Sequence, residues 1–124
     1  MDKSELDETL EVVLKFDASG LIPAIVCDHT NNEVLMFAWM NAEALEKTQA
    51  TGLAHFFSRS RGSLWFKGES SGETFAVNEI RVDCDQDVLQ LRVTAQGKGN
   101  ACHTGRRSCF YRKLENGKLA FIKS

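Results

Sequence analysis

Short apolar runs, separated by polar turn residues, dominate the chain and predict a fold rich in strands. Residues 21–27 and 34–39 are apolar, and the segment 28–32 between them is rich in aspartate, asparagine and threonine. Such residues favour turns, so the two runs are expected to pair as a hairpin. Asn41 then offers an N-cap to a run of helix-forming residues that Gly52 would close, which predicts a helix between them.

Beyond this helix the pattern is strand-like. Glycines separate short runs, and we place the expected strands at 53–57, 63–66, 74–82, 88–94, 108–113 and 119–122. The first 17 residues are acidic with an apolar end, and predict a short helix or strand that leads into the core. Many short antiparallel strands with one or two helices indicate an α+β, mainly β fold.

Length and composition favour one domain spanning 1–124, because 124 residues with 43% hydrophobic and 26% charged side chains are typical of a soluble globular unit. The net charge of −2 gives no reason to expect nucleic acid or membrane binding. The start is acidic and lacks a signal sequence, and no apolar run approaches the ~20 residues of a membrane span. We therefore expect a cytoplasmic protein, whose four cysteines are thiols or metal ligands rather than disulfides.

The densest acidic cluster holds Asp83, Asp85 and Asp87. In an extended segment alternate side chains share one face, so these carboxylates would lie together. Like charges repel unless a cation neutralises them, and Mg²⁺ prefers oxygen ligands. An EF-hand loop is excluded, because its sixth position would be Val88 rather than glycine. The spacing leaves open a magnesium site or a solvated acidic strand end.

Three cysteines, Cys84, Cys102 and Cys109, are candidate zinc ligands, although their spacing is not the paired pattern of zinc ribbons. Cysteine is also often a small buried hydrophobe, which is our interpretation of Cys27. Cys102 and His103, however, lie in a polar loop with glycines, a poor place to bury an inert thiol. Three thiolates with one open position describe a catalytic zinc site, in which bound water loses a proton near pH ~7.

Geometry complicates this interpretation. In a regular strand Cys84 would point away from Asp83 and Asp85. One short segment could then serve two metal sites on opposite faces, or on opposite sides of a subunit interface. Histidine titrates near neutrality, and His103, beside a candidate zinc ligand, is favoured over His55 as the catalytic group.

A basic, glycine-containing loop follows the expected strand at 53–57. Arginine and backbone amides suit phosphate oxygens, although composition alone favours a plain polar hairpin loop. Its tryptophan could stack on a base, but a core position is the better default. Its glutamate could pair with the nearby lysine or contact a substrate. The candidate substrate-binding residues are Arg59, Ser60, Arg61, Trp65, Lys67 and Glu69.

Short segments in a fixed order carry a resemblance to a known family: 34–41, 56–61, 64–65, 67–72, 83–87, 101–105 and 108–110. Together they resemble phosphoribosyl-AMP cyclohydrolase over roughly residues 20–112. The resemblance implies hydrolysis of the N1–C6 bond of the adenine ring in N1-(5-phosphoribosyl)-AMP. The product would be the open-ring formimino aminoimidazole carboxamide ribonucleotide, in the third step of L-histidine biosynthesis.

The same resemblance implies a zinc ion per subunit that activates water, a magnesium ion and His103 as a catalytic group. It carries over Cys84, Cys102 and Cys109 as zinc ligands, and Asp83, Asp85 and Asp87 as the magnesium site. Family members are intertwined homodimers whose zinc site takes cysteines from both subunits, which would resolve the geometry at Cys84.

The chain departs from the family pattern at a few positions, none of them a proposed ligand. Phe57 stands where tryptophan is usual, Phe66 where a basic or polar residue is common, and Gln86 where the residue is small. Many bacterial members are fused to a pyrophosphohydrolase. Because this chain ends at Ser124, we expect that activity to lie elsewhere.

Two other functions fit the residues less well. A zinc base deaminase needs a His-x-Glu element and a paired-cysteine element, and the sequence has neither. A small structural-zinc module for RNA would explain the cysteines and the basic loop. The net charge of −2 and the clustered aspartates count against it.

Overall fold

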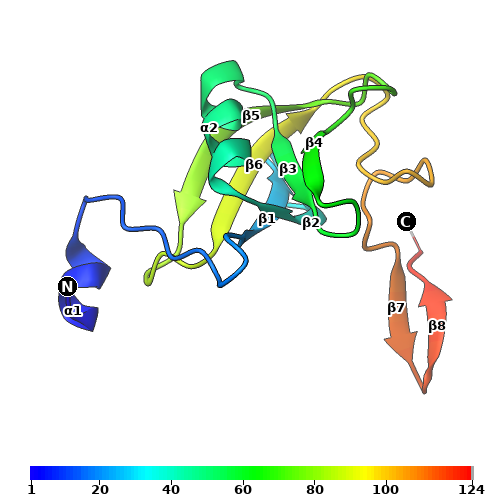
Figure 1. Cartoon of the computed structure of the whole chain (residues 1–124). Helices are drawn as coiled ribbons and strands as arrows, with labels where there is room; N and C mark the ends of the chain where they lie inside the picture. The colour runs from blue at the N-terminus through cyan, green and yellow to red at the C-terminus, as the bar shows by residue number, and fades with distance from the viewer. Residues whose placement is uncertain (124) are drawn as a thin grey trace.

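A curved sheet organises residues 1–123, the part of the chain that the computed structural model describes (Figure 1). The helices are α1 (Lys3–Glu8) and α2 (Ala42–Thr51). The strands are β1 (Ile22–Asp28), β2 (Val34–Met40), β3 (His55–Ser58), β4 (Ser63–Phe66), β5 (Phe75–Val82), β6 (Leu89–Ala95), β7 (Arg112–Glu115) and β8 (Lys118–Phe121). The mainly β class with two helices confirms the prediction from the sequence pattern.

The six-stranded sheet has the order β4-β3-β2-β1-β6-β5, and β7 pairs only with β8. Neighbouring strands are antiparallel, except that β1 and β6 are parallel. The sheet also curls back on itself. The Ala54 amide donates to the Phe75 carbonyl (3.0 Å), and the Val77 amide donates to the Gly52 carbonyl (2.8 Å), which links the start of β3 to β5.

The expected hairpin and helix are both confirmed. β1 and β2 pair with Ala24 opposite Ala38. The side chain of Asn41 accepts a hydrogen bond from the Ala44 amide (2.8 Å) and so caps α2. Gly52 ends the helix with a φ of 75°, a left-handed conformation that glycine adopts without steric cost.

The core lies between the curled sheet and α2. Phe56 and Phe75 are fully buried there, and Thr48 of α2 is 1% exposed. β1 and β6 are both internal strands of the sheet, and their inward side chains are buried. These are Ile22, Ala24, Val26, Leu89, Leu91 and Val93. Cys27 is buried too, as expected.

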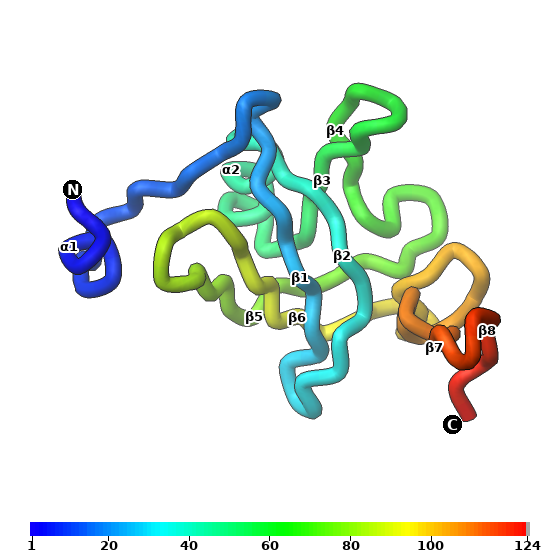
Figure 2. Tube along the Cα trace, turned by 90° about the horizontal axis from the view of Figure 1, so that it is seen from below, coloured from blue at the N-terminus to red at the C-terminus, as the bar shows by residue number. Residues whose placement is uncertain are grey.

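At the ends of the chain, the short N-terminal helix is confirmed as α1, whereas one strand near the C-terminus was placed too early. Only Leu14 and Phe16 of the apolar N-terminal run pack against the core, whereas Leu10 and Val12 are exposed. The strand expected at 108–113 begins only at Arg112, because the preceding residues belong to a loop. The β7–β8 hairpin extends away from the six-stranded sheet (Figures 1 and 2). Within the described part of the chain, no helix is long and apolar enough to cross a membrane.

Candidate functional site

The candidate residues fall at two opposite ends of the sheet. The connection between β5 and β6, residues 83–88, lies near α1 at one end, and the loop 96–111 lies at the other (Figures 1 and 2). We call these the aspartate turn and the cysteine loop. The candidate substrate-binding residues lie in the turn between β3 and β4, within β4, and in the loop that follows β4.

The aspartate turn is not the extended segment that the sequence predicted. The antiparallel β5 and β6 must be joined by a reversal of the chain, and residues 83–88 provide it. The Gln86 amide donates to the Asp83 carbonyl (3.1 Å), and Gln86 has a φ of 61°. The Asp83 carboxylate accepts from the amides of Asp87 (3.0 Å) and Val88 (3.1 Å). Local hydrogen bonds thus fix the turn.

This turn still brings the three carboxylates together. Oxygen atoms of Asp83, Asp85 and Asp87 lie within 4.8 Å of one another. Asp85 Oδ1 is buried without a hydrogen-bond partner among the described residues. Hydrogen bonding and charge repulsion from Asp85 and Asp83 raise the pKa of Asp87 to about 6. An unpartnered buried oxygen beside two further carboxylates fits a divalent cation with oxygen ligands.

The cysteine loop buries Cys102, although its polar composition argued against burial. The loop folds back on itself, since the Ala101 amide donates to the Arg107 carbonyl (2.9 Å) and the Cys102 amide donates to the Arg106 carbonyl (3.0 Å). It also attaches to β2, where the Cys109 amide donates to the Leu35 carbonyl (2.8 Å). Long-range backbone bonds, which composition does not reveal, enclose the thiol.

Arg107 holds this loop to the β1–β2 hairpin. Its guanidinium pairs with Asp28 at 2.5 Å and with Glu33 at 2.6 Å. Ser108 Oγ adds a hydrogen bond to the Val34 carbonyl (2.7 Å). Hydrogen bonds from the Thr30 hydroxyl and backbone amides, with Arg107, keep the pKa of Asp28 well below its usual range. The sequence pattern gives no sign of this role for Arg107, because its partners lie more than 70 residues away.

The thiols of Cys102 and Cys109 are neighbours and differ in acidity. Burial acts to raise the pKa of Cys102, but hydrogen bonds from Thr104, with its hydroxyl 3.1 Å from the sulfur, outweigh burial and lower that pKa. Burial and the adjacent Cys102 raise the pKa of Cys109 to about 11. A cation bound between the sulfurs would stabilise both thiolates.

Lys67 lies beside these thiols. Burial lowers its pKa, against the attraction of Glu73 and the two cysteines. Its ammonium donates to the Glu73 carbonyl (3.1 Å) and lies 4.9 Å from the centre of the Phe75 ring. His103 is exposed next to Cys102.

Cys84 does not join the other two candidate zinc ligands within one chain. It is exposed on the aspartate turn, at the far end of the sheet from the cysteine loop. Among the described residues, the three aspartates form the one group of three possible metal ligands. Within one chain, the three candidate zinc ligands therefore do not come together.

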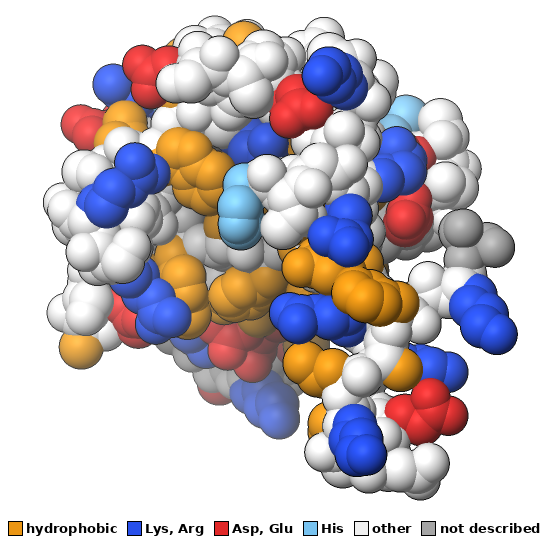
Figure 3. Space-filling view, turned by 90° about the vertical axis from the view of Figure 1, so that its right-hand side faces the viewer, with side chains coloured by type: hydrophobic (Ala, Val, Ile, Leu, Met, Phe, Trp, Pro, Cys, Tyr) orange, Lys and Arg blue, Asp and Glu red, His pale blue; other side chains and the backbone are white. Residues whose placement is uncertain are grey.

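Four of the six candidate substrate-binding residues border a small groove of about 220 Å³. Arg61, Trp65, Lys67 and Glu69 line it, together with serines at 70 and 71 that sequence reasoning did not single out. Arg59 instead lies 4.6 Å over the Trp39 ring, and Ser60 is exposed in the adjacent turn. On this side of the molecule, lysine and arginine side chains surround apolar patches (Figure 3).

Comparison with known proteins identifies the family. The sequence model of phosphoribosyl-AMP cyclohydrolase matches residues 36–111. A protein of that name from Caulobacter sp. (strain K31) is 55% identical over 95% of this chain and 88% of its own length. Another from Albidiferax ferrireducens is 61% identical over 85% of this chain and 83% of its own length.

The chain belongs to the phosphoribosyl-AMP cyclohydrolase family. It is therefore an enzyme of the hydrolase class. The range matched to the cyclohydrolase family contains the aspartate turn, the cysteine loop and the basic groove. The N-terminal segment, β1 and the β7–β8 hairpin lie outside that range.

Proposed function

We propose that this chain hydrolyses the N1–C6 bond of the adenine ring in N1-(5-phosphoribosyl)-AMP, the third step of L-histidine biosynthesis. Water adds across the bond: its oxygen ends on C6, a proton ends on N1, and the ring opens to the formimino aminoimidazole carboxamide ribonucleotide. The observation that carries the proposal is the neighbouring pair of Cys102 and Cys109, held by the sheet within a chain of this family.

We further propose that this pair and Cys84 of the partner subunit hold one zinc ion in an intertwined homodimer. The separation of Cys84 from the other two cysteines in one chain supports this arrangement. When bound, zinc supplies a Lewis acid that lowers the pKa of a water molecule to near 7.

The chain's own residues would then position the substrate and move protons. Thr104 orients the Cys102 sulfur through its hydroxyl. His103, which is exposed and follows Cys102 in the chain, would take a proton from water and return it to N1. Arg61 and Glu69, which line the groove, would contact a phosphate and a ribose hydroxyl of the substrate.

The aspartate turn would hold magnesium, because the unpartnered Asp85 oxygen and its two neighbours supply the hard ligands that this ion prefers. Asp85→Asn is expected to keep zinc but to raise the magnesium concentration needed for half-maximal turnover. An unchanged magnesium dependence would mean that the aspartates are only a solvated acidic turn.

The test of the zinc proposal compares Cys102→Ser with Cys27→Ala as a control. Cys27 is buried in β1, outside the proposed site. Cys102→Ser should lose zinc and turnover together, whereas Cys27→Ala should keep both. A Cys102→Ser protein with full zinc content and full turnover would remove Cys102 from the site.

Mixing two inactive variants tests the shared site. A heterodimer of Cys84→Ser with Cys102→Ser would contain one intact site of two, so random reassociation should restore about a quarter of wild-type turnover. Failure of the mixture to recover, when native gels show that heterodimers form, would place all ligands in one chain.

A further inference from the structure

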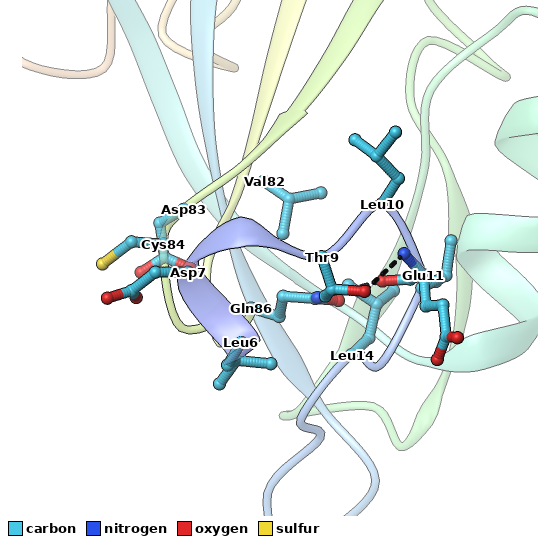
Figure 4. A pocket seen from close by; sticks show the side chains of 11 residues that line it. Leu6, Asp7, Thr9, Leu10, Glu11, Leu14, Val82, Asp83, Cys84 and Gln86 are labelled. Atoms are coloured by element: carbon cyan, nitrogen blue, oxygen red, sulfur yellow. Dashed lines mark hydrogen bonds between the residues drawn. The ribbon is translucent and has the colours of Figure 1, made fainter. Parts of the chain in front are cut away.

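The N-terminal segment crosses the aspartate turn, where Gln86 makes hydrogen bonds to Glu11, Val13 and Lys15. The Gln86 side chain is buried, at 7% exposed, and points from the turn toward the segment (Figure 4). Its Oε1 accepts from the Val13 amide (2.6 Å), and its Nε2 donates to the Glu11 carbonyl (3.1 Å). Its own carbonyl accepts from the Lys15 amide (2.8 Å).

A glutamine suits this position for a chemical reason. Its carboxamide accepts a hydrogen bond from the Val13 amide and donates one to the Glu11 carbonyl. The position therefore needs a side chain that carries both an acceptor and a donor at its end. Glutamate lacks the donor, and asparagine is one methylene shorter. Apolar burial does little to hold residues 10–13, because Leu10 and Val12 are exposed.

The same residue shapes the turn. Gln86 adopts a φ of 61°, and its amide donates to the Asp83 carbonyl. The segment and the turn also line an open pocket of about 330 Å³, with Cys84 and Asp7 at one end and Gln86 within its lining (Figure 4).

We propose that Gln86 is a positioning residue that fastens the N-terminal segment to the aspartate turn and thereby sets the spacing of Asp83, Asp85 and Asp87 for a divalent cation. The identity of that cation as magnesium rests on the proposed function. The partners of Gln86, which are Glu11, Val13 and Lys15, all lie outside the range that the family model matches.

Gln86→Gly removes the whole side chain, carboxamide included, and permits the same backbone conformation, because glycine adopts a positive φ freely. The matched control is Asn116→Gly, which replaces another non-glycine residue of positive φ (52°) in the β7–β8 turn. Both variants are made in the full-length zinc-loaded protein. The measurements are amide hydrogen exchange, calorimetric titration with Mg²⁺, and the magnesium concentration for half-maximal turnover.

Gln86→Gly is expected to accelerate exchange at Val13 and Lys15 and to weaken Mg²⁺ binding about tenfold, as loss of an outer contact commonly does at metal sites. Asn116→Gly should change neither. Faster exchange with unchanged Mg²⁺ affinity would overturn the proposal, since Gln86 would then only tether the segment. Unchanged exchange would overturn it as well.

The two proposals fail in different ways. A wild-type protein that turns over but binds no Mg²⁺ overturns the role of Gln86 and leaves the reaction standing. A wild-type protein that binds Mg²⁺, loses that affinity in Gln86→Gly, and does not turn over overturns the reaction and leaves the positioning role standing.

Discussion

Replacing Arg107 by methionine removes the guanidinium that joins the cysteine loop to the β1–β2 hairpin while keeping most of the side chain's volume. A hydrogen bond to a charged group contributes about 1.5–3 kcal/mol when it is shielded from water. Here the Arg107 side chain is 43% exposed, which weakens the pair, and Asp28 keeps its bonds from Thr30 and Asn31. The exposed ion pair between Arg107 and Glu33 adds at most about 0.5 kcal/mol to the free energy of unfolding.

The expected loss of unfolding free energy is therefore about 1 kcal/mol, or a fall in melting temperature of about 4 °C for a domain of this size. Urea unfolding and calorimetry would measure it. Because the same loop carries Cys102 and Cys109, zinc should also dissociate faster from the variant. The matched control is Arg106→Met, whose guanidinium lies 4.0 Å over the Tyr111 ring and makes no ion pair among the described residues. Equal stability and equal zinc release in the two variants would refute this account of the loop.

Three further predictions follow from the core, the loops and the aspartate turn. Phe56→Ala should lower the free energy of unfolding, measured with urea, by about 3–5 kcal/mol, because Phe56 is fully buried. A loss below about 1 kcal/mol would contradict the placement of Phe56 in the core. Gly68→Ala should lower the free energy of unfolding by about 2 kcal/mol or more, because the added Cβ would lie 2.5 Å from the Glu73 backbone. Gly72→Ala, where the added Cβ meets open space, should lower it by about 1 kcal/mol. Equal losses would argue against the close approach of Gly68 to Glu73. The pKa of Asp87 is raised from 3.8 to about 6, so metal-free protein should lose stability as the pH rises from about 4 to 6; Asp87→Asn should abolish this slope, and a slope that persists would assign it elsewhere.

Local signals in the sequence predicted the local structure well. The β1–β2 hairpin and α2 formed as expected, because turn residues, the Asn41 cap and Gly52 act within a few residues of themselves. The strand at 63–66 was placed correctly for the same reason. The grouping of the three aspartates was correct too, although the argument from an extended strand was wrong.

Features that depend on distant partners did not follow from the pattern. The aspartate turn exists because β5 must reverse into β6, and the parallel pairing of β1 with β6 is a property of the whole sheet. Arg107 and Gln86 owe their roles to partners more than 70 residues away, which no local spacing reveals. The sequence suggested that Cys84 could lie apart from the other two cysteines, but the fold was needed to place it at the opposite end of the sheet from the cysteine loop.

The most direct test of the central claim is turnover of phosphoribosyl-AMP by the purified full-length protein, followed by the absorbance change of ring opening, with and without a zinc chelator. The account predicts turnover that the chelator abolishes and added zinc restores. Absence of turnover in dimeric protein supplied with zinc and magnesium would contradict the proposed reaction. Turnover that persists after zinc is removed would contradict the role given to Cys84, Cys102 and Cys109.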